Sequence, residues 1–289
     1  MTAYRFIEQE KANHSIRLMC RVLRVSRSGF YDWSGREDCP SADLPLRTRI
    51  RAIHAESRGT YGTPRVNRQL RRQGLTVNRK RVVRLMRQEG LAGVPKRRFR
   101  VQTTQADPAA RKAANLLNRQ FTADAPDTTW VADITYLRTV QGWSYLAVVI
   151  DLYSRKIVGW AVENQMEASL CIKALRRALA VRQPRPGLLH HSDRGSQYTS
   201  LAYQALLDEH QAVASMSRRG NCWDNAVAES FFGTFKQEMQ SRQPFRSVAH
   251  ARAEVGNYIH QFYNPVRLHS ANGHRSPVQT EEMFRALNS

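Results

Sequence analysis

Three carboxylate residues stand in sequence surroundings that suit metal-dependent chemistry. Asp133 interrupts the alternating pattern of an expected strand, T-W-V-A-D-I-T-Y-L, and Asp193 follows a short apolar run in L-L-H-H-S-D-R-G-S-Q-Y. Glu229 lies in a helix-forming run, N-A-V-A-E-S-F-F-G-T-F-K. A carboxylate inside a half-buried strand is costly unless something pairs with it. Taken singly, each aspartate also fits a capping or turn residue and Glu229 fits a surface charge, so their meaning depends on whether they meet.

If the three carboxylates meet, they repel one another unless divalent cations neutralise them. Oxygen ligands on separate elements, without supporting thiols, suit Mg²⁺ or Mn²⁺ rather than zinc. Two such ions can flank a phosphodiester, activating the attacking oxygen on one side and stabilising the leaving oxygen on the other. The chemistry that this set of residues predicts is therefore phosphoryl transfer on a polynucleotide.

The helix expected around Glu229 has two different faces. Asp224 is a good helix N-cap, and an apolar stripe for burial follows it. That stripe consists of Phe231, Phe235 and Met239. The opposite face carries Asn225, Glu229, Phe232 and Lys236. The acid and the base on this face stand two turns apart, roughly 10 Å by the rise per residue.

These motifs resemble those of a known family. W-V-A-D-I-T-Y, V-V-I-D-L-Y-S-R-K-I-V-G-W, H-S-D-R-G-S-Q-Y and M-S-R-R-G-N-C-W-D-N-A-V-A-E-S-F-F-G-T-F-K look like the integrase-type DDE core of insertion-sequence transposases. The match is to the second-frame (OrfB) protein of the IS-three-like family. Its hallmark is two aspartates and a glutamate, with 35 residues before the glutamate and a basic residue seven after it. Here 35 residues separate Asp193 from Glu229, and Lys236 stands seven beyond.

The resemblance implies a metal-dependent DNA transposase, which cleaves and joins DNA at the ends of its own insertion sequence. It makes Asp133, Asp193 and Glu229 the catalytic and metal-binding residues, with two Mg²⁺ or Mn²⁺ ions in each active site. Lys236 and Asn225 become DNA contacts, Lys236 next to the scissile phosphate. The implied partners are the terminal inverted repeats, target DNA, further copies of the chain and an upstream-frame (OrfA) protein or fusion. A circular intermediate is also implied.

The distribution of charge predicts nucleic-acid binding independently. The chain of 289 residues has a formal net charge of +21, and residues 1–100 contain 24 Lys and Arg against 8 Asp and Glu. Basic character concentrated in one part of a chain indicates a polyanion partner, of which DNA is the usual one, although a solvated basic face is the plain alternative. The candidate DNA contacts in this part are Arg65, Arg68, Arg79, Lys80, Arg84, Lys96, Arg97 and Arg98.

Local signals predict three short helices within residues 46–100. Thr63 is the expected cap of the second helix with Pro64 at its first position, and Asn78 is the expected cap of a third that Gly90 ends. The sequences Y-G-x-x-R-V and R-V-x-R-L-M resemble the helix-turn-helix domain that precedes these cores. Upstream, residues 15–33 suit a helix-turn-helix remnant or, equally, a plain helical hairpin.

The expected organisation has five parts. A helix-turn-helix remnant with a linker from residue 34 fills residues 1–45, and a basic helix-turn-helix domain fills 46–100. A linker over 101–126 with partial helix near 109–118 leads to a catalytic core at 127–243 and a helical extension at 244–289. In the extension, Ala271 and Asn272 stand where the family pattern has a more apolar pair.

The order of elements in the core predicts an α/β fold. Three strands come first, turning at Gln141-Gly142, and the order continues helix, strand, helix, strand, helix. The resemblance implies the specific architecture: a ribonuclease H-like core with a mixed five-stranded sheet flanked by helices, preceded by small all-α helix-turn-helix segments. Asp151 ends the second strand, where it either touches the metal site or caps the turn that follows; the turn is the favoured interpretation.

Several other classes of protein do not fit the sequence. The four cysteines, Cys20, Cys39, Cys171 and Cys222, lack CxxC spacing, so neither a disulfide frame nor a zinc site is expected. No apolar stretch is long enough for a membrane span and no export signal is present, so we expect a cytoplasmic, nucleoid-associated bacterial protein.

Two other functions remain open at this point. A non-catalytic DNA-binding regulator descended from a transposase would not need the three carboxylates or their spacing. A structure-specific nuclease of the same fold would cut DNA without joining it, and would not need the helix-turn-helix region or the sequence before Glu229.

Overall fold

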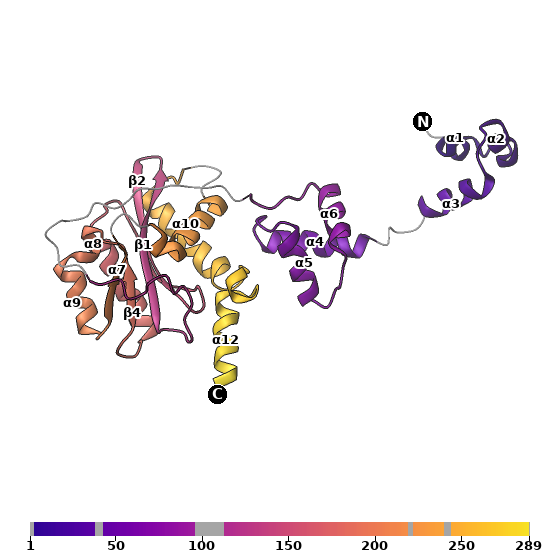
Figure 1. Ribbon diagram of the computed structural model, residues 1–289. Helices are drawn as coiled ribbons and strands as arrows, with labels where there is room; N and C mark the ends of the chain where they lie inside the picture. The colour runs from indigo at the N-terminus through magenta and orange to yellow at the C-terminus, as the bar shows by residue number, and fades with distance from the viewer. Residues whose placement is uncertain (1–2, 38–42, 96–112, 219–221, 240–243, 289) are drawn as a thin grey trace. The chain divides into compact units, whose positions relative to one another are not determined.

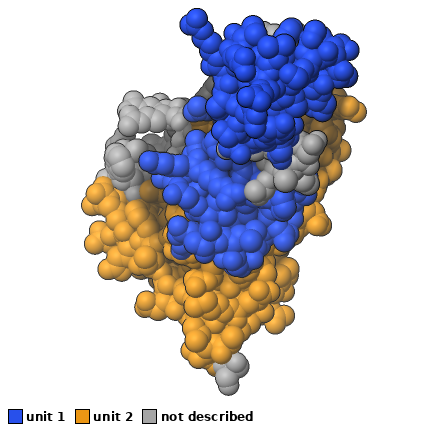
Figure 2. All heavy atoms as spheres, turned by 90° about the vertical axis from the view of Figure 1, so that its right-hand side faces the viewer, with its two compact units in different colours: residues 1–92 blue, residues 93–289 orange. Residues whose placement is uncertain are grey.

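The computed structural model describes residues 3–37, 43–95, 113–218, 222–239 and 244–288 (Figure 1). The chain divides into two compact units, residues 1–92 and 93–289 (Figure 2). The candidates Lys96, Arg97 and Arg98 lie outside the described residues. The five-part division remains a prediction.

The first three helices, α1 (Ala3–Glu10), α2 (Ile16–Val22) and α3 (Arg27–Glu37), share a small apolar core. The core consists of Ile7, Met19, Cys20 and Phe30. Ser15 caps α2 by accepting a hydrogen bond from the backbone N–H of Leu18. The expectation of a linker from residue 34 is wrong at its start, because α3 continues to Glu37.

Three more helices follow in the first unit: α4 (Leu44–Glu56), α5 (Thr63–Arg72) and α6 (Arg79–Gln88). Asn78 caps α6 as expected, accepting from the backbone N–H of Lys80. The expected cap of α5 is wrong, because Gly62 is the N-cap and Thr63 already lies within the helix. Apolar side chains between these helices are buried, namely Ile50, Ile53, Val66, Leu70, Val82, Leu85 and Met86.

The second unit contains a mixed sheet of five described strands, as predicted. They are β1 (Thr129–Thr139), β2 (Gly142–Asp151), β3 (Ile157–Glu163), β4 (Leu189–Ser192) and β5 (Val213–Met216). Their order is β3-β2-β1-β4-β5. The hairpin pairs β1–β2 and β2–β3 are antiparallel, whereas β1–β4 and β4–β5 are parallel. β1 is therefore central, and Trp130, Val131 and Ala132 are all buried, so this strand is covered on both faces.

Helices α7 (Ala168–Arg182), α8 (Ser196–Thr199) and α9 (Leu201–Glu209) share a core with the sheet. α7 lies close against β3 because Gly159 leaves room for it: a Cβ there would stand 2.2 Å from the main-chain oxygen of Ala174. Helix α10 (Ala226–Met239), preceded by the 3₁₀ turn η1 (Cys222–Asn225), carries Glu229. Phe231 and Phe235 of α10 are buried, which confirms the predicted stripe at these two positions.

The segment before the core is docked and not helical. The prediction of partial helix near 109–118 is wrong for residues 113–118, the part of that range that the structure describes. The backbone N–H of Met216 donates to the oxygen of Ala114, and the N–H groups of Leu116 and Leu117 donate to Ser215 Oγ. Leu117 is buried. Pairing with β5 and burial of Leu117 replace the local hydrogen bonds of a helix, and we call residues 113–119 the docked segment.

The C-terminal part wraps back onto the core through α11 (Val248–Asn257), the π-helix η2 (Tyr258–Tyr263), the 3₁₀ turn η3 (Ser270–Asn272) and α12 (Pro277–Asn288). Asn272 is buried and its Nδ2 donates to the oxygen of Ser154 at 2.6 Å. That hydrogen bond gives the buried polar side chain of Asn272 a partner within the core. In the described part of the chain, no helix is long and apolar enough to cross a membrane.

Candidate active site

Asp133 lies in the middle of the central strand β1, opposite Val148 of β2. Its Oδ1 accepts a hydrogen bond from the backbone N–H of Ile134 at 2.8 Å. Burial raises the pKa of Asp133 well above its usual range, and the negative charges of Asp193 and Glu229 raise it further. The Ile134 N–H and the positive charge of Lys236 act in the opposite direction. The charges of Asp193, Glu229 and Lys236 therefore all act on Asp133.

Asp193 comes directly after β4, which pairs in parallel with β1. The register places Thr129 opposite Leu189 and Val131 opposite His191, so counting on by two residues brings Asp193 opposite Asp133. Neighbouring strands stand about 4.8 Å apart, which makes these two carboxylates neighbours. Asp193 Oδ1 also accepts from the backbone N–H of Gly195 at 2.9 Å, which turns the chain into α8.

Helix α10 brings Glu229 and Lys236 to the same place. Glu229 is exposed on the helix surface, although partial burial raises its pKa. Lys236 is buried, and burial lowers the pKa of its ammonium to about 8, with Asp133 opposing that effect. Asn225, just before the helix, donates from Nδ2 to the main-chain oxygen of Ala132 at 3.2 Å. The predicted face of α10 therefore lies against β1, with Phe232 buried on it.

The loop between β5 and α10 is tied to both strands of the site. The backbone N–H of Ser217 donates to the oxygen of Ser192, next to Asp193. His191 is buried between two hydroxyls, with Nδ1 2.8 Å from Ser215 Oγ and Nε2 3.1 Å from Ser217 Oγ. Burial lowers the pKa of His191 to about 4, so this ring is neutral at physiological pH.

The prediction that Asp224 caps the Glu229 helix is wrong. Asp224 lies in η1 and is fully buried, and its carboxylate binds the side chains of Arg218, Arg119 and Asn115. Because these three side chains bind its carboxylate oxygens, Asp224 does not cap the first turn of α10. Arg119 and Asn115 were not among the predicted site residues, and no sequence pattern joins them to a carboxylate 105 and 109 positions later.

Asp151 belongs to the turn after β2, the favoured interpretation. Its Oδ1 accepts from the backbone N–H and the hydroxyl of Ser154, both at 2.7 Å, and its Oδ2 accepts from the N–H of Asp127. It pairs across the sheet with Trp130, three residues before Asp133. These bonds use both oxygens of the side chain for local structure.

Asp133, Asp193 and Glu229 are the candidate ligands for a divalent cation. In the described ranges, no three His, Cys, Asp or Glu side chains lie together as a complete ligand set. The three carboxylates nevertheless supply the oxygen donors that Mg²⁺ or Mn²⁺ takes. Burial and the charges of Asp193 and Glu229 disfavour the charged form of Asp133 and so raise its pKa, and a bound cation would offset both effects. Their carboxylate oxygens are therefore suitable donors for such an ion, although the three side chains are not arranged as a complete ligand set in the described residues.

The predicted DNA contacts of the first unit lie on α5 and α6. Arg68, Arg79 and Lys80 are exposed. The guanidinium of Arg65 lies over the Tyr61 ring, 5.5 Å from its centre. Arg84 is exposed but forms an ion pair with Asp43 at 2.7 Å, so part of its charge is compensated within the protein.

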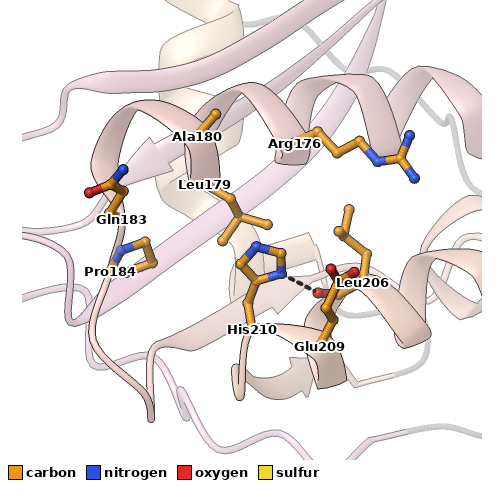
Figure 3. Close-up of a pocket in the computed structure, with 8 residues that line it drawn as sticks. All are labelled: Arg176, Leu179, Ala180, Gln183, Pro184, Leu206, Glu209 and His210. Carbon is orange, nitrogen blue, oxygen red and sulfur yellow. Dashed lines mark hydrogen bonds between the residues drawn. The ribbon is translucent and has the colours of Figure 1, made fainter.

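An open pocket lies elsewhere, between α7 and α9, where Arg176, Glu209 and His210 line it (Figure 3). The ring of His210 hydrogen-bonds the oxygen of Leu206 at 3.0 Å, which closes the end of α9. The candidate carboxylates are not among its lining residues.

Comparisons with known proteins agree with this arrangement. Residues 41–99 match the family model "HTH-like domain", and residues 123–222 and 210–277 match models described as "Integrase core domain". The chain is 43% identical over 282 residues to transposase InsF for insertion sequence IS3A of Escherichia coli (strain K12), covering 96% of this chain and 98% of the relative. It is 42% identical over 271 residues to the insertion element IS600 uncharacterized 31 kDa protein of Shigella sonnei, covering 93% of this chain and 99% of the relative.

Among solved structures, the HTLV-2 integrase catalytic core domain in complex with magnesium covers 55% of this chain and 99% of its own, with 13% identity and a TM-score of 0.42. The family assignment does not depend on that likeness, since the sequence relatives match over almost the whole chain. The core described above, the helices before it and the two near full-length relatives together show that this chain belongs to the IS3 family of insertion-sequence transposases, with an integrase core domain preceded by an HTH-like domain.

Proposed function

We propose that this transposase cleaves DNA at the ends of its own insertion sequence and joins those ends to a second strand, using Asp133, Asp193 and Glu229 as catalytic carboxylates. The observation that supports the proposal is the parallel pairing of β1 with β4, because Asp133 lies in β1 and Asp193 directly follows β4. The hydrogen bond from Asn225 to Ala132 brings the third candidate, on α10, to the same strand.

In this proposal the three carboxylates hold two Mg²⁺ or Mn²⁺ ions. Bound ions of this kind supply Lewis-acid stabilisation of the attacking and leaving oxygens of a phosphodiester. Asp133 is the fixed ligand, because it projects from a buried central strand. Glu229 would be the most accessible ligand of the three, because its side chain is exposed on the surface of α10.

Two successive displacements then account for cleavage and joining. In the first, a water oxygen bonds to phosphorus at the element's end, the bond from phosphorus to the 3′ oxygen breaks, and that oxygen leaves as a 3′ hydroxyl. In the second, the 3′ hydroxyl oxygen loses its proton and bonds to a phosphorus of another strand, while the bond from that phosphorus to the 3′ oxygen of its own strand breaks and that oxygen leaves as a new 3′ hydroxyl. The same carboxylates serve both steps. Lys236 holds a phosphate beside the reacting one through its positive charge.

The remaining parts of the proposal concern partners. As an IS3-family transposase with an HTH-like domain, the protein binds DNA. We assign the exposed basic residues of α5 and α6 to phosphate contacts, which provide affinity without sequence specificity. Further copies of the chain would hold paired ends of the element, and an upstream-frame protein would supply additional DNA binding. Because the proposed substrate is DNA, we expect the transposase to act at the bacterial chromosome in the cytoplasm.

The test uses labelled DNA from the sequence flanking the gene, incubated with Mg²⁺ or Mn²⁺. Wild-type protein, Glu229→Gln and the matched control Glu282→Gln, an exposed glutamate of α12, are compared with and without the upstream-frame fusion. Nicks and joined products from the wild type and the control, absent with Glu229→Gln, are the expected result. Equal DNA binding with no cutting by any protein would favour the regulator. Nicks without joined products would favour the nuclease.

A further inference from the structure

Two arginines share one buried carboxylate in the second unit. Asp224 is fully buried, and it accepts from Arg218 through Nε and Nη2, both at 2.9 Å, and from the Arg218 backbone N–H at 3.0 Å. Arg119 of the docked segment donates from Nε at 2.9 Å. The hydrogen bonds from Arg218 hold the pKa of Asp224 far below its usual range, so this carboxylate is charged at every working pH.

The charges in this cluster do not balance. Two guanidinium groups meet one carboxylate, which leaves one positive charge in excess. The side chains of Arg119 and Arg218 remain 46% and 49% exposed, so this charge faces solvent. Among the described residues, Arg119 uses only Nε, and both of its terminal nitrogens keep their hydrogens for another acceptor.

The cluster adjoins the candidate active site on two sides. Arg218 follows Ser217, whose N–H binds the oxygen of Ser192 next to Asp193. Asp224 precedes Asn225, whose side chain binds the oxygen of Ala132 next to Asp133. Since consecutive Cα atoms are 3.8 Å apart, both ends of the loop lie within a few residues' reach of the carboxylates.

We propose that Arg119 and Arg218 form a phosphodiester-binding site for the DNA backbone beside the reacting strand. The inference rests on the proposed function, since it supplies a DNA contact for that reaction. A planar guanidinium with fixed donors suits phosphate oxygens better than a mobile ammonium does. Asp224 fixes both side chains in advance, which lowers the entropy lost when a phosphate binds. One phosphodiester would neutralise the excess charge.

Arg119 lies between the residues matched by the HTH-like model and those matched by the integrase-core model. A phosphate bound there would hold the docked segment in place while DNA is engaged. DNA at the site would therefore stabilise the segment that covers β5.

The test measures binding without divalent metal, so that no cutting occurs. Duplexes of the element's end and of unrelated sequence are titrated with the full chain by fluorescence anisotropy over a range of salt concentrations. Single neutral methylphosphonate links then replace each phosphate along the end in turn. The main variant, Arg119→Gln/Arg218→Gln/Asp224→Asn, removes all three charges together and leaves no buried ion unpaired. Arg252→Gln is the matched control, because Arg252 on α11 is 46% exposed and also pairs with a glutamate.

The proposal predicts that one or two methylphosphonate positions weaken the wild type and Arg252→Gln on the order of tenfold, with no such penalty in the triple variant. The slope of log K against log salt should fall by about 1 in the triple variant, on both duplexes. Arg119→Gln alone repeats the measurement with Asp224 still held by Arg218, should the triple variant unfold. If a folded variant shows the same methylphosphonate pattern and the same salt slope as the wild type, the proposal is overturned. The two arginines would then only stabilise the fold. Failure of the wild type to cut DNA with Mg²⁺, both alone and fused to the upstream frame, would refute the proposed function without altering this binding result.

Discussion

The side-chain amide of Asn225 donates to the main-chain oxygen of Ala132 across 3.2 Å, joining the start of the Glu229 helix to the residue before Asp133. The two residues are 93 positions apart, so the contact is a tertiary link between elements that carry different candidate ligands. Asn225 is buried, which shields the bond from water.

Replacement of Asn225 by alanine should therefore slow strand transfer more than it destabilises the protein. Loss of the bond leaves the Ala132 carbonyl without this donor, at a cost of about 1–2 kcal/mol in the free energy of unfolding. A shift of α10 by up to about 1 Å should lower the rate roughly 10- to 100-fold. Single-turnover joining assays and urea unfolding measure the two effects. A variant that joins DNA at the wild-type rate would show that this link does not position Glu229.

Asp133→Asn should stabilise the protein while abolishing its activity. The substitution removes a buried negative charge that is repelled by Asp193 and Glu229, so in EDTA the melting temperature should rise by about 2–4 °C, the equivalent of roughly 1 kcal/mol. Added Mg²⁺ should raise the melting temperature of the wild type and leave that of Asp133→Asn almost unchanged. Scanning calorimetry with and without metal is the measurement. Equal responses of both proteins to Mg²⁺ would place the metal elsewhere.

Arg267 should be essential for stability, because it holds Glu238 at the end of α10. Both side chains are almost fully buried, and Glu238 also accepts from the Tyr258 hydroxyl at 2.6 Å. Arg267→Ala leaves that carboxylate buried without its cation, at a cost of roughly 3–5 kcal/mol. The double replacement Arg267→Met/Glu238→Leu should recover most of the loss, since it removes both charges. Chemical unfolding of the three proteins tests this, and a double variant as unstable as Arg267→Ala would contradict it.

Stability should fall as the pH drops from about 6.5 to 4. Burial lowers the pKa of His190 to about 4, with the charge of His191 acting in the same direction. Over this window the unfolded chain binds a proton at His190 that the folded protein excludes, so acid favours unfolding, and the effect levels off below pH 4. His190 contributes up to about 3 kcal/mol to the change.

His190→Gln should reduce the slope of unfolding free energy against pH by up to about 1.4 kcal/mol per unit. Glutamine retains a partner for the Tyr203 hydroxyl, which lies 3.1 Å from His190 Nε2. Parallel curves for the wild type and His190→Gln would contradict the assignment.

The sequence could predict those parts of the molecule that depend on local pattern. The strand around Asp133, the turn at Gly142 and the apolar stripe of α10 all follow from alternation, turn chemistry and helical spacing. The spacing of Asp193 and Glu229 helped to identify the family, and the family implied a mixed five-stranded sheet that no local pattern contains. The chemical roles of the candidate residues remain predictions.

Contacts between distant segments could not be predicted in the same way. Asp224 has the residue type and position of a helix cap, yet Arg119, 105 residues earlier, takes one of its oxygens. Residues 113–118 have helix-forming composition, but hydrogen bonds to β5 and burial of Leu117 outweigh that preference. α12 begins at Pro277, and its Glu281 binds Arg182 and Lys156, which lie about 100 or more positions earlier in the chain.

The docked segment sets where an independent catalytic fragment can begin. The integrase-core match starts at residue 123, but β5 is the last strand of the sheet, and the segment at 113–119 covers its open edge. A fragment cut at residue 123 would lose Asn115 and Arg119, two of the partners of Asp224, and would expose a strand edge of the kind that promotes aggregation. We therefore expect a stable fragment of the integrase core to begin no later than Ala113, because residues 113–119 pack on the core although they precede the matched region.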